Sequence, residues 1–140
     1  MVFHTNEQPA PKAPVIRLNP VTASLFSDVA RQAAEACPSK RNDQNKTTQL
    51  RRFYDELVMW HDKVFSAKTL EEQQKNLYKY LPYIQMLRAK VAYAKGRDLV
   101  DMNFYELFDN LIKQITTLET LKTARLFFEA FLGYKKFNEK

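Results

Sequence analysis

The chain has 140 residues, of which 45% are hydrophobic and 13% aromatic, so it is long enough to fold as one domain with a sizeable core. It carries 22 Lys and Arg residues against 16 Asp and Glu residues, with two glycines and a single cysteine. This composition excludes a glycine-rich phosphate loop, an internal disulfide and a cysteine-based zinc site, and it argues against a turn-rich β-sandwich. The single cysteine fits a reducing cytoplasm, and no apolar run approaches the roughly 18–20 residues of a transmembrane helix, so we expect a soluble, cytoplasmic, helical protein without a membrane partner. We also expect no cofactor.

The N-terminal part of the sequence differs from the rest. Residues 1–18 contain three prolines and no periodic apolar pattern, which predicts a flexible N-terminal arm. Residues 19–140 are predicted to form a single helical-bundle domain. Its first helix is expected over 20–36, because Asn19-Pro20 has the pattern of an N-cap followed by proline at the first helical position. A polar loop over 38–46, with a mobile and basic tip, follows.

The next two helices have recognisable starts. Thr48 is predicted to cap a helix over 49–66. Thr69 is predicted to cap a third helix, because a glutamate follows it at the spacing of a capping box. The apolar stripe of this helix continues to Gly96, but the helix contains Pro82. A proline in a helix interior costs about 3 kcal/mol, so we expect a kink or a break near Pro82.

Two more helices complete the predicted fold. One is expected over 98–115, and the last begins at a cap provided by Thr117 or Thr120. The last helix is apolar on two sides, and such a helix lies in the centre of a bundle or reserves one side for a partner. One stripe contains Ala124, Phe127, Phe128, Phe131 and Tyr134, and the other Leu126, Ala130, Gly133 and Phe137. The predicted fold class is all-α, a compact bundle of about five helices.

The positive charge is concentrated in the middle of the chain. Residues 47–100 hold ten basic and six acidic residues, whereas residues 101–140 hold six of each. Tyrosines interleave with the basic residues in this middle region. A basic region of this kind is the electrostatic footprint of a nucleic-acid partner. The alternative is an ordinary basic protein whose lysines are simply solvated.

The most informative segment is the second half of the third predicted helix. Arg88 and Lys95 flank its inward face on one side, and Lys90 and Arg97 flank it on the other. The second pair lies beside Tyr83, Met86 and Tyr93. Each pair is seven residues apart, which is about 10–11 Å along a helix, a separation that suits successive phosphates of one strand. Arginine adds bidentate phosphate contacts and tyrosine a stacking surface for a base. The alternative is that these side chains are solvated flanks whose stems cover the core.

A second basic pair lies near the start of the second predicted helix. Asp55 and Glu56 follow Arg51 and Arg52 at i,i+4 spacing, so an intrahelical ion pair is expected for at least one arginine. The residues predicted to contact nucleic-acid phosphates are Arg51, Arg52, Arg88, Lys90, Lys95 and Arg97.

No catalytic or metal-binding motif is present. The sequence lacks HExxH, GxSxG and any cluster of cysteine and histidine. His61 lies on the apolar stripe of its helix, which favours a structural role. An enzyme that uses His61 with Glu56 or Asp62 as an acid–base pair is the alternative. We predict that the protein is not an enzyme and holds no metal.

Three stretches of the sequence resemble the small subunit of the type III-A CRISPR effector, the Csm complex. They are TTQLRRFYDEL (47–57), LPYIQMLRAKVAYAKGR (81–97) and FFEAFLGYKKF (127–137). The matching residues are Gln49, Leu50, Arg51, Arg52, Phe53 and Tyr54 in the first stretch, Leu87, Arg88, Lys90, Tyr93, Ala94, Gly96 and Arg97 in the second, and Glu129, Ala130, Tyr134 and Lys136 in the third. Phe131 and Gly133 depart from the residues usual in the third stretch. The resemblance covers roughly residues 20–137.

The resemblance implies a non-catalytic, cytoplasmic subunit in defence against foreign nucleic acid. In that family several copies stack along the complex, beside other subunits that hold the guide RNA. The copies contact guide RNA and target RNA through basic side chains, without sequence preference. Target cutting and synthesis of signalling nucleotides belong to other subunits. Two alternatives remain at this point: a helical protein–protein adaptor without an RNA role, and the small subunit of a related type III complex.

Overall fold

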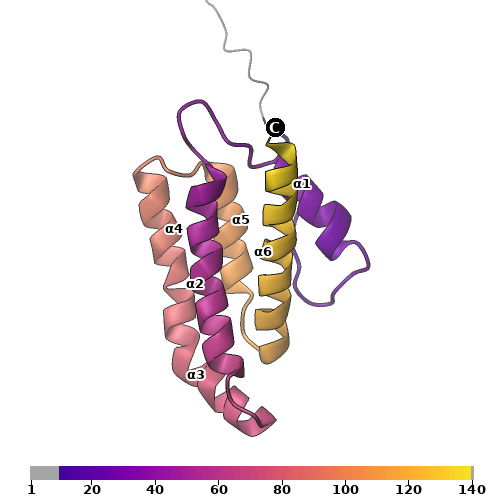
Figure 1. Cartoon of the computed structure of the whole chain (residues 1–140), viewed down its shortest axis with the longest axis vertical. Helices are drawn as coiled ribbons and strands as arrows, with labels where there is room; N and C mark the ends of the chain where they lie inside the picture. The colour runs from indigo at the N-terminus through magenta and orange to yellow at the C-terminus, as the bar shows by residue number, and fades with distance from the viewer. Residues whose placement is uncertain (1–9, 140) are drawn as a thin grey trace, which may run out of the picture.

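The computed structural model describes residues 10–139, which form helices and connecting loops (Figure 1). Residues 1–9, half of the predicted N-terminal arm, lie outside the described residues. The elements in chain order are a π-helical turn η1 (Leu25–Val29), α1 (Ala30–Glu35), α2 (Thr47–Phe65), α3 (Leu70–Gln85), α4 (Leu87–Gly96), α5 (Met102–Lys113) and α6 (Leu118–Asn138). Between residues 10 and 139 there is no β-strand.

The predicted all-α bundle of about five helices, with a break near Pro82, is confirmed. Only Met86 separates α3 from α4, so the two form one long helix with an interruption. The Met86 backbone N–H donates to the Pro82 carbonyl (N···O 3.1 Å), and the Met86 carbonyl accepts from the Lys90 N–H at 3.1 Å. The helical hydrogen bonds therefore continue through the interruption. Side chains on α3 and α4 keep one common helical spacing.

The helices pack as neighbours in a single bundle. α6 contacts α1 and α2, α2 also packs against α3, and α4 packs against α5. Figure 1 shows α2 and α4 side by side, with α1 on the far side of α6. This arrangement leaves one long side of the bundle, formed by α2 with α3 and α4, away from the N-terminal part of the chain.

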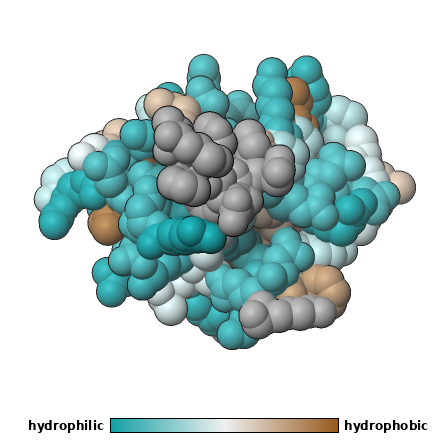
Figure 2. Space-filling view, turned by 90° about the horizontal axis from the view of Figure 1, so that it is seen from above, coloured by the Kyte–Doolittle hydropathy of each residue, from teal (hydrophilic) through white to brown (hydrophobic). Residues whose placement is uncertain are grey.

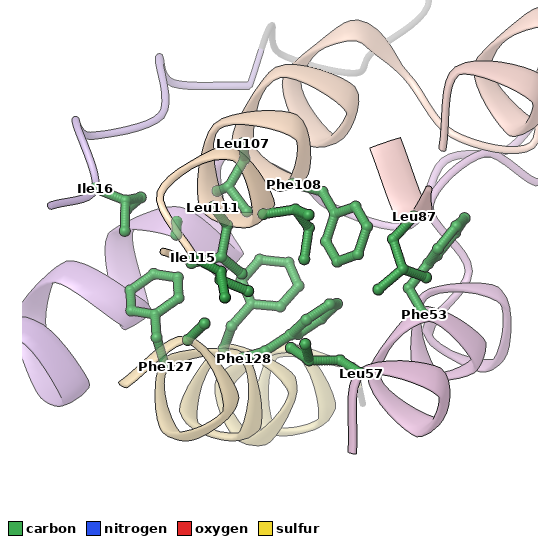
Figure 3. Packing of buried hydrophobic residues seen from close by; sticks show 14 of the residues in the cluster. Ile16, Phe53, Leu57, Leu87, Leu107, Phe108, Leu111, Ile115, Phe127 and Phe128 are labelled. Atoms are coloured by element: carbon green, nitrogen blue, oxygen red, sulfur yellow. The ribbon is translucent and has the colours of Figure 1, made fainter. Parts of the chain in front are cut away.

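An aromatic cluster from α2, α5 and α6 forms the centre of the core. Its contacting rings have centroids 5.1 to 6.2 Å apart, the range in which aromatic pairs attract one another. Figure 3 shows Phe53, Phe108 and Phe128 entering this core from α2, α5 and α6. The members of the cluster are Phe53, Phe104, Phe108, Phe128 and Phe131.

The two predicted apolar stripes of α6 have different environments. Phe127 and Phe128 of the first stripe are buried, each with 1% of its surface exposed. Leu126 and Phe137 of the second stripe are 44% and 67% exposed. The first stripe is therefore the core-facing one.

The predicted first helix over 20–36 is wrong at its start. Residues Asn19 and Pro20 form a bend, and helical structure begins at Leu25. Instead, the preceding extended segment packs on the bundle, because Ile16 and Leu18 are both only 2% exposed. Gln114, the C-cap residue of α5, fixes this segment: its side chain accepts a hydrogen bond from the Leu18 N–H (3.0 Å) and donates one to the Ile16 carbonyl (2.7 Å).

Side-chain caps define the starts of three helices. The Thr69 cap of α3 is confirmed, since its hydroxyl accepts a hydrogen bond from the Glu72 N–H at 3.2 Å. Thr117 caps α6. The predicted helix over 98–115 begins later than expected, because Asp101 is the cap and accepts from the third N–H of α5 at 3.0 Å. The Thr48 cap is wrong: α2 begins at Thr47, two residues before the predicted start, and its N-cap residue Lys46 makes no side-chain capping bond.

The loop over 38–46 is anchored to the end of the bundle. Asn45 is fully buried, its N–H donates to the Leu99 carbonyl at 3.1 Å, and its side-chain oxygen accepts from the Asp101 N–H at 3.0 Å. Lys135 of α6, only 2% exposed, donates to the Asn45 carbonyl. Figure 2 views this end of the molecule from above and shows mostly hydrophilic surface, with few apolar side chains. The predicted mobile loop is thus held at its base by a buried polar network.

Candidate nucleic-acid interface

A stripe of basic, aromatic and methionine side chains runs along one exposed face of α3 and α4. Its members follow one another at alternating steps of four and three residues, the spacing of a single helix face. Because the helical hydrogen bonds continue through Met86, the stripe also continues across the α3–α4 interruption. Tyr83 is 53% exposed, Met86 55% and Tyr93 66%. This basic–aromatic stripe consists of Lys79, Tyr83, Met86, Lys90, Tyr93 and Arg97.

Trp60 of α2 supports the stripe from the neighbouring helix. Its indole stacks on the ring of Tyr83, with centroids 5.4 Å apart and an interplanar angle of 14°. Trp60 also packs against Tyr80, at 5.6 Å and 39°. The Lys63 ammonium lies 6.0 Å from the Trp60 ring centroid, within the range of a cation–π contact. The ring of Tyr83 is therefore held in place by contacts from α2.

A shallow groove between α2 and α4 adjoins the stripe. It is lined by Arg52, Asp55, Glu56, Met59, Trp60 and Lys90. Within it, the Lys90 ammonium donates to a Glu56 carboxylate oxygen at 2.7 Å. Arg52 has no ion pair with any residue in the described part of the chain. The groove thus brings two of the predicted phosphate-contacting residues, Arg52 and Lys90, together from different helices.

Three of the six predicted phosphate-contacting residues form ion pairs. The pairs, with their N···O distances, are Arg51–Asp55 at 3.8 Å, Lys90–Glu56 at 2.7 Å and Arg88–Asp109 at 2.8 Å. The hydrogen bond that Arg88 donates to the Asp109 carboxylate raises the pKa of Arg88 above its usual value. Exposed ion pairs contribute only about 0–1 kcal/mol. This applies to Arg51–Asp55, whose side chains are 66% and 63% exposed, whereas the Asp109 and Glu56 side chains are 25% and 27% exposed.

The other three are Arg52, Lys95 and Arg97. None of them is ion-paired with a carboxylate of residues 10–139. The Arg97 guanidinium lies 5.8 Å from the Tyr93 ring centroid, and its Nη1 donates to the Tyr93 hydroxyl at 3.4 Å. Arg97 is thereby ordered by an aromatic neighbour while its charge stays uncompensated.

The six residues do not share one surface. Lys90 bonds to Glu56 of α2, whereas Arg88 bonds to Asp109 of α5, so these two lie on opposite flanks of α4. Lys95 follows Arg88 by seven residues and lies on the α5 flank. The stripe and the groove therefore hold Arg52, Lys90 and Arg97, while Arg88 and Lys95 form a separate pair.

His61 contacts one of the two acids considered as its acid–base partner. Nδ1 of His61 lies 3.0 Å from the carboxylate of Asp62, which is 69% exposed. Glu56, the other acid considered, is engaged by Lys90. The His61 ring packs on Phe65, with centroids 4.7 Å apart. Within residues 10–139 no group of three or more metal-ligating side chains comes together.

Sequence reasoning missed part of the stripe. It began the basic segment after Pro82, and so it left out Lys79 and did not pair Tyr83 with Trp60. A sequence signal for Lys79 existed, because the four- and three-residue steps continue backwards through Pro82. Trp60 had no such signal, since its contact with Tyr83 joins two different helices.

Comparison with known families identifies the chain. The model of the Csm2 Type III-A family matches residues 23–140, which is well over half of the sequence. The chain belongs to this family. The Csm2 family is the small subunit of the type III-A CRISPR effector, the Csm complex, so the resemblance inferred from the three sequence stretches is confirmed. No match was found among curated proteins or among solved structures.

Membership of the Csm2 family has consequences for the whole chain. It makes the chain a small structural subunit that assembles with other Csm subunits and CRISPR RNA. The matched region contains every α-helix from α1 to α6, but not the packed segment with Ile16 and Leu18. None of the helices in the described part of the chain has the length and apolar character needed to span a membrane.

Proposed function

We propose that this Csm2-family subunit contacts the RNA of its complex through phosphate groups, without reading the sequence and without contributing a catalytic group. The observation that supports this most directly is the basic–aromatic stripe with its adjoining groove. Arg52 and Arg97 have no ion pair with a carboxylate in the described chain, and the Lys90–Glu56 pair is partly exposed. Cations in this state gain most from a phosphate partner, because little existing interaction is lost.

The spacing along α4 fits a strand of RNA. Lys90 and Arg97 are seven residues apart on one helix face, about 10–11 Å along the axis. Arg88 and Lys95 repeat this spacing on the α5 flank, and we include them, together with Arg51, among the proposed phosphate contacts. Because these contacts are electrostatic interactions with phosphates, RNA affinity should depend strongly on salt and weakly on sequence.

We also propose that several copies of the subunit stack along the guide–target RNA. The outer apolar stripe of α6, with Leu126 44% exposed, supports a protein contact on the side of the bundle formed by this helix. A neighbouring copy or another Csm subunit would cover it. The adaptor role without RNA is the competing proposal, and the same exposed stripe favours it.

The RNA contact can be tested by fluorescence anisotropy. A labelled single-stranded RNA of about 30 nucleotides is titrated with the protein at several salt concentrations. The double variant Lys90→Gln/Arg97→Gln should bind more weakly, and its salt slope should be flatter by about 1.4, since each lost phosphate contact removes about 0.7. Thermal unfolding should be little changed, because both side chains are on the surface.

The matched control is Lys113→Gln/Lys136→Gln, which removes the same charge from two exposed sites away from the stripe. Equal weakening by the two double variants would mean that only net charge matters and would contradict the proposed interface. If the free subunit does not bind RNA at low salt, the same variants are compared in the purified Csm complex. An unchanged affinity for target RNA there would favour the adaptor.

A further inference from the structure

The ring of Tyr83 has the properties of a preformed stacking platform. One of its faces lies against the Trp60 indole at 5.4 Å and 14°, while the side chain as a whole is 53% exposed. Trp60 is in turn packed on Tyr80. An exposed tyrosine ordinarily loses rotamer freedom when it binds a ligand. Here the stack on α2 has already restricted the ring, which lowers the entropic cost of binding.

We propose that Tyr83 stacks on one unpaired RNA base, so that this part of the stripe recognises a single-stranded nucleotide. The inference rests on the proposed RNA contact and adds to it that the contacted nucleotide is not base-paired. In an A-form duplex each base is covered by its neighbours and offers no ring face to a protein side chain. An aromatic ring that stacks on a base therefore selects an unpaired or extruded nucleotide.

The groups around Tyr83 suit the rest of such a nucleotide. Lys79 precedes it by one helical turn, about 6 Å along the axis, and Lys90 follows at about 10–11 Å. The two lysines thus precede and follow Tyr83 on the same helix face, with the Lys79 ammonium 5.4 Å from the ring centroid of the adjacent Tyr80. Met86, 55% exposed, offers an apolar contact to the ribose or base edge. No acidic side chain belongs to the stripe itself, and the nearest carboxylate that contacts it is that of Glu56, paired with Lys90.

The fold also supplies a reporter. Trp60 is the single tryptophan of the chain, and its indole is stacked with the ring of Tyr83 at a centroid distance of 5.4 Å. A base that stacks on the outer face of Tyr83 changes the environment of this pair of rings. The fluorescence emission of Trp60 should therefore change when the full-length protein binds a 12-nucleotide oligouridylate. It should not change when the protein binds an abasic oligonucleotide of the same length and charge.

Affinity measurements on ring variants test the same point. Tyr83→Ala should weaken binding of the oligouridylate about 5- to 100-fold, the effect of losing one base–aromatic stack, with an unchanged salt slope. Tyr83→Phe keeps the ring and should bind as tightly as the unmodified chain. Tyr83→Leu retains an apolar contact with Trp60 but should bind as weakly as Tyr83→Ala, which separates stacking from local folding. Tyr78→Ala is the control, because Tyr78 is 69% exposed on α3 and lies outside the stripe.

The outcomes separate this inference from the RNA contact on which it rests. If Tyr83→Ala binds as well as the unmodified chain, or if the abasic oligonucleotide binds equally well with the same Trp60 response, stacking is overturned and the phosphate contacts stand. Tighter binding of a 12-base-pair RNA duplex than of the oligouridylate would also overturn it. If neither oligonucleotide binds at low salt, the proposed phosphate interface fails first.

Discussion

The ammonium group of Lys135 donates a 2.9 Å hydrogen bond to the backbone carbonyl of Asn45, ninety residues earlier in the chain. It also donates to the carbonyl of Cys37 at 2.8 Å and to the hydroxyl of Ser39 at 3.1 Å. The side-chain amide of Asn45 donates to the Pro38 carbonyl at 3.3 Å. One lysine near the end of α6 therefore holds both ends of the loop over 38–46 against the bundle. Burial lowers the pKa of Lys135, while the nearby carboxylates of Glu139 and Asp101 act in the opposite direction and the three acceptors satisfy its ammonium group.

Replacement of Lys135 by methionine should destabilise the protein. The variant removes the ammonium group that donates hydrogen bonds to the buried carbonyls of Cys37 and Asn45. The free energy of unfolding should fall by about 1–3 kcal/mol. Urea denaturation followed by circular dichroism measures this loss. Lys136→Met is the matched control, since it removes the same charge from an exposed site in the same helical turn and should change stability little. A Lys135→Met variant more stable than the unmodified chain would mean that desolvation of the ammonium outweighs its hydrogen bonds.

Asp101 should make the protein less stable in acid. Burial tends to raise its pKa, but the hydrogen bonds from the Phe104 N–H (3.0 Å) and from Lys40 (2.9 Å) lower the pKa below its ordinary value of 3.8. Because the pKa is lower in the folded state, the carboxylate stabilises the fold above about pH 3.8. This contribution is lost as the pH falls through the folded-state pKa.

Asp101→Asn isolates the charge, because asparagine caps a helix about as well as aspartate. The variant should lose about 1.5–3 kcal/mol at pH 7, the usual contribution of hydrogen bonds to a charged group. The difference from the unmodified chain should shrink as the pH falls below 3.8. Denaturant midpoints between pH 7 and pH 2.5 measure it, and a difference that stays constant over this range would contradict the assigned role.

The two stripes of α6 should respond differently to truncation. Phe127→Ala, at a residue 1% exposed, should cost about 3–5 kcal/mol because it leaves a cavity in the core. Leu87→Ala, at a fully buried residue of α4, should cost about 2–5 kcal/mol. Leu126→Ala, at a residue 44% exposed, should cost much less. Chemical denaturation of each variant measures its loss in free energy of unfolding. Equal losses for Leu126→Ala and Phe127→Ala would mean that the inward face of α6 is assigned wrongly.

Local patterns predicted the helices well but failed at one end. The Thr69 cap of α3 was correct, because a cap depends on residues three positions apart. Asn19-Pro20 has an equally good local pattern, yet helical structure starts at Leu25. The preceding segment instead binds the side chain of Gln114, which is nearly a hundred residues away. No pattern within a few residues contains that contact.

In the candidate site, too, local contacts were predicted correctly and contacts between helices were not. The expected intrahelical pair Arg51–Asp55 is present at 3.8 Å, because both residues lie on one helix. The equivalent partner of Arg52, Glu56, bonds instead to Lys90, thirty-four residues further along the chain. Sequence reasoning named Arg52 and Lys90 separately and had no means of joining them in one groove.

The sequence by itself determined the all-α fold class, the family and most of the basic side chains of the stripe. These properties repeat at helical spacing or lie within short stretches, so they follow from neighbouring residues alone. Only the tertiary structure decided which cations face α2, which are neutralised by a carboxylate from another helix, and that Trp60 supports Tyr83. Those relations depend on how helices distant in sequence pack side by side, because an ion pair or a ring stack forms only where packing brings two side chains within a few ångströms.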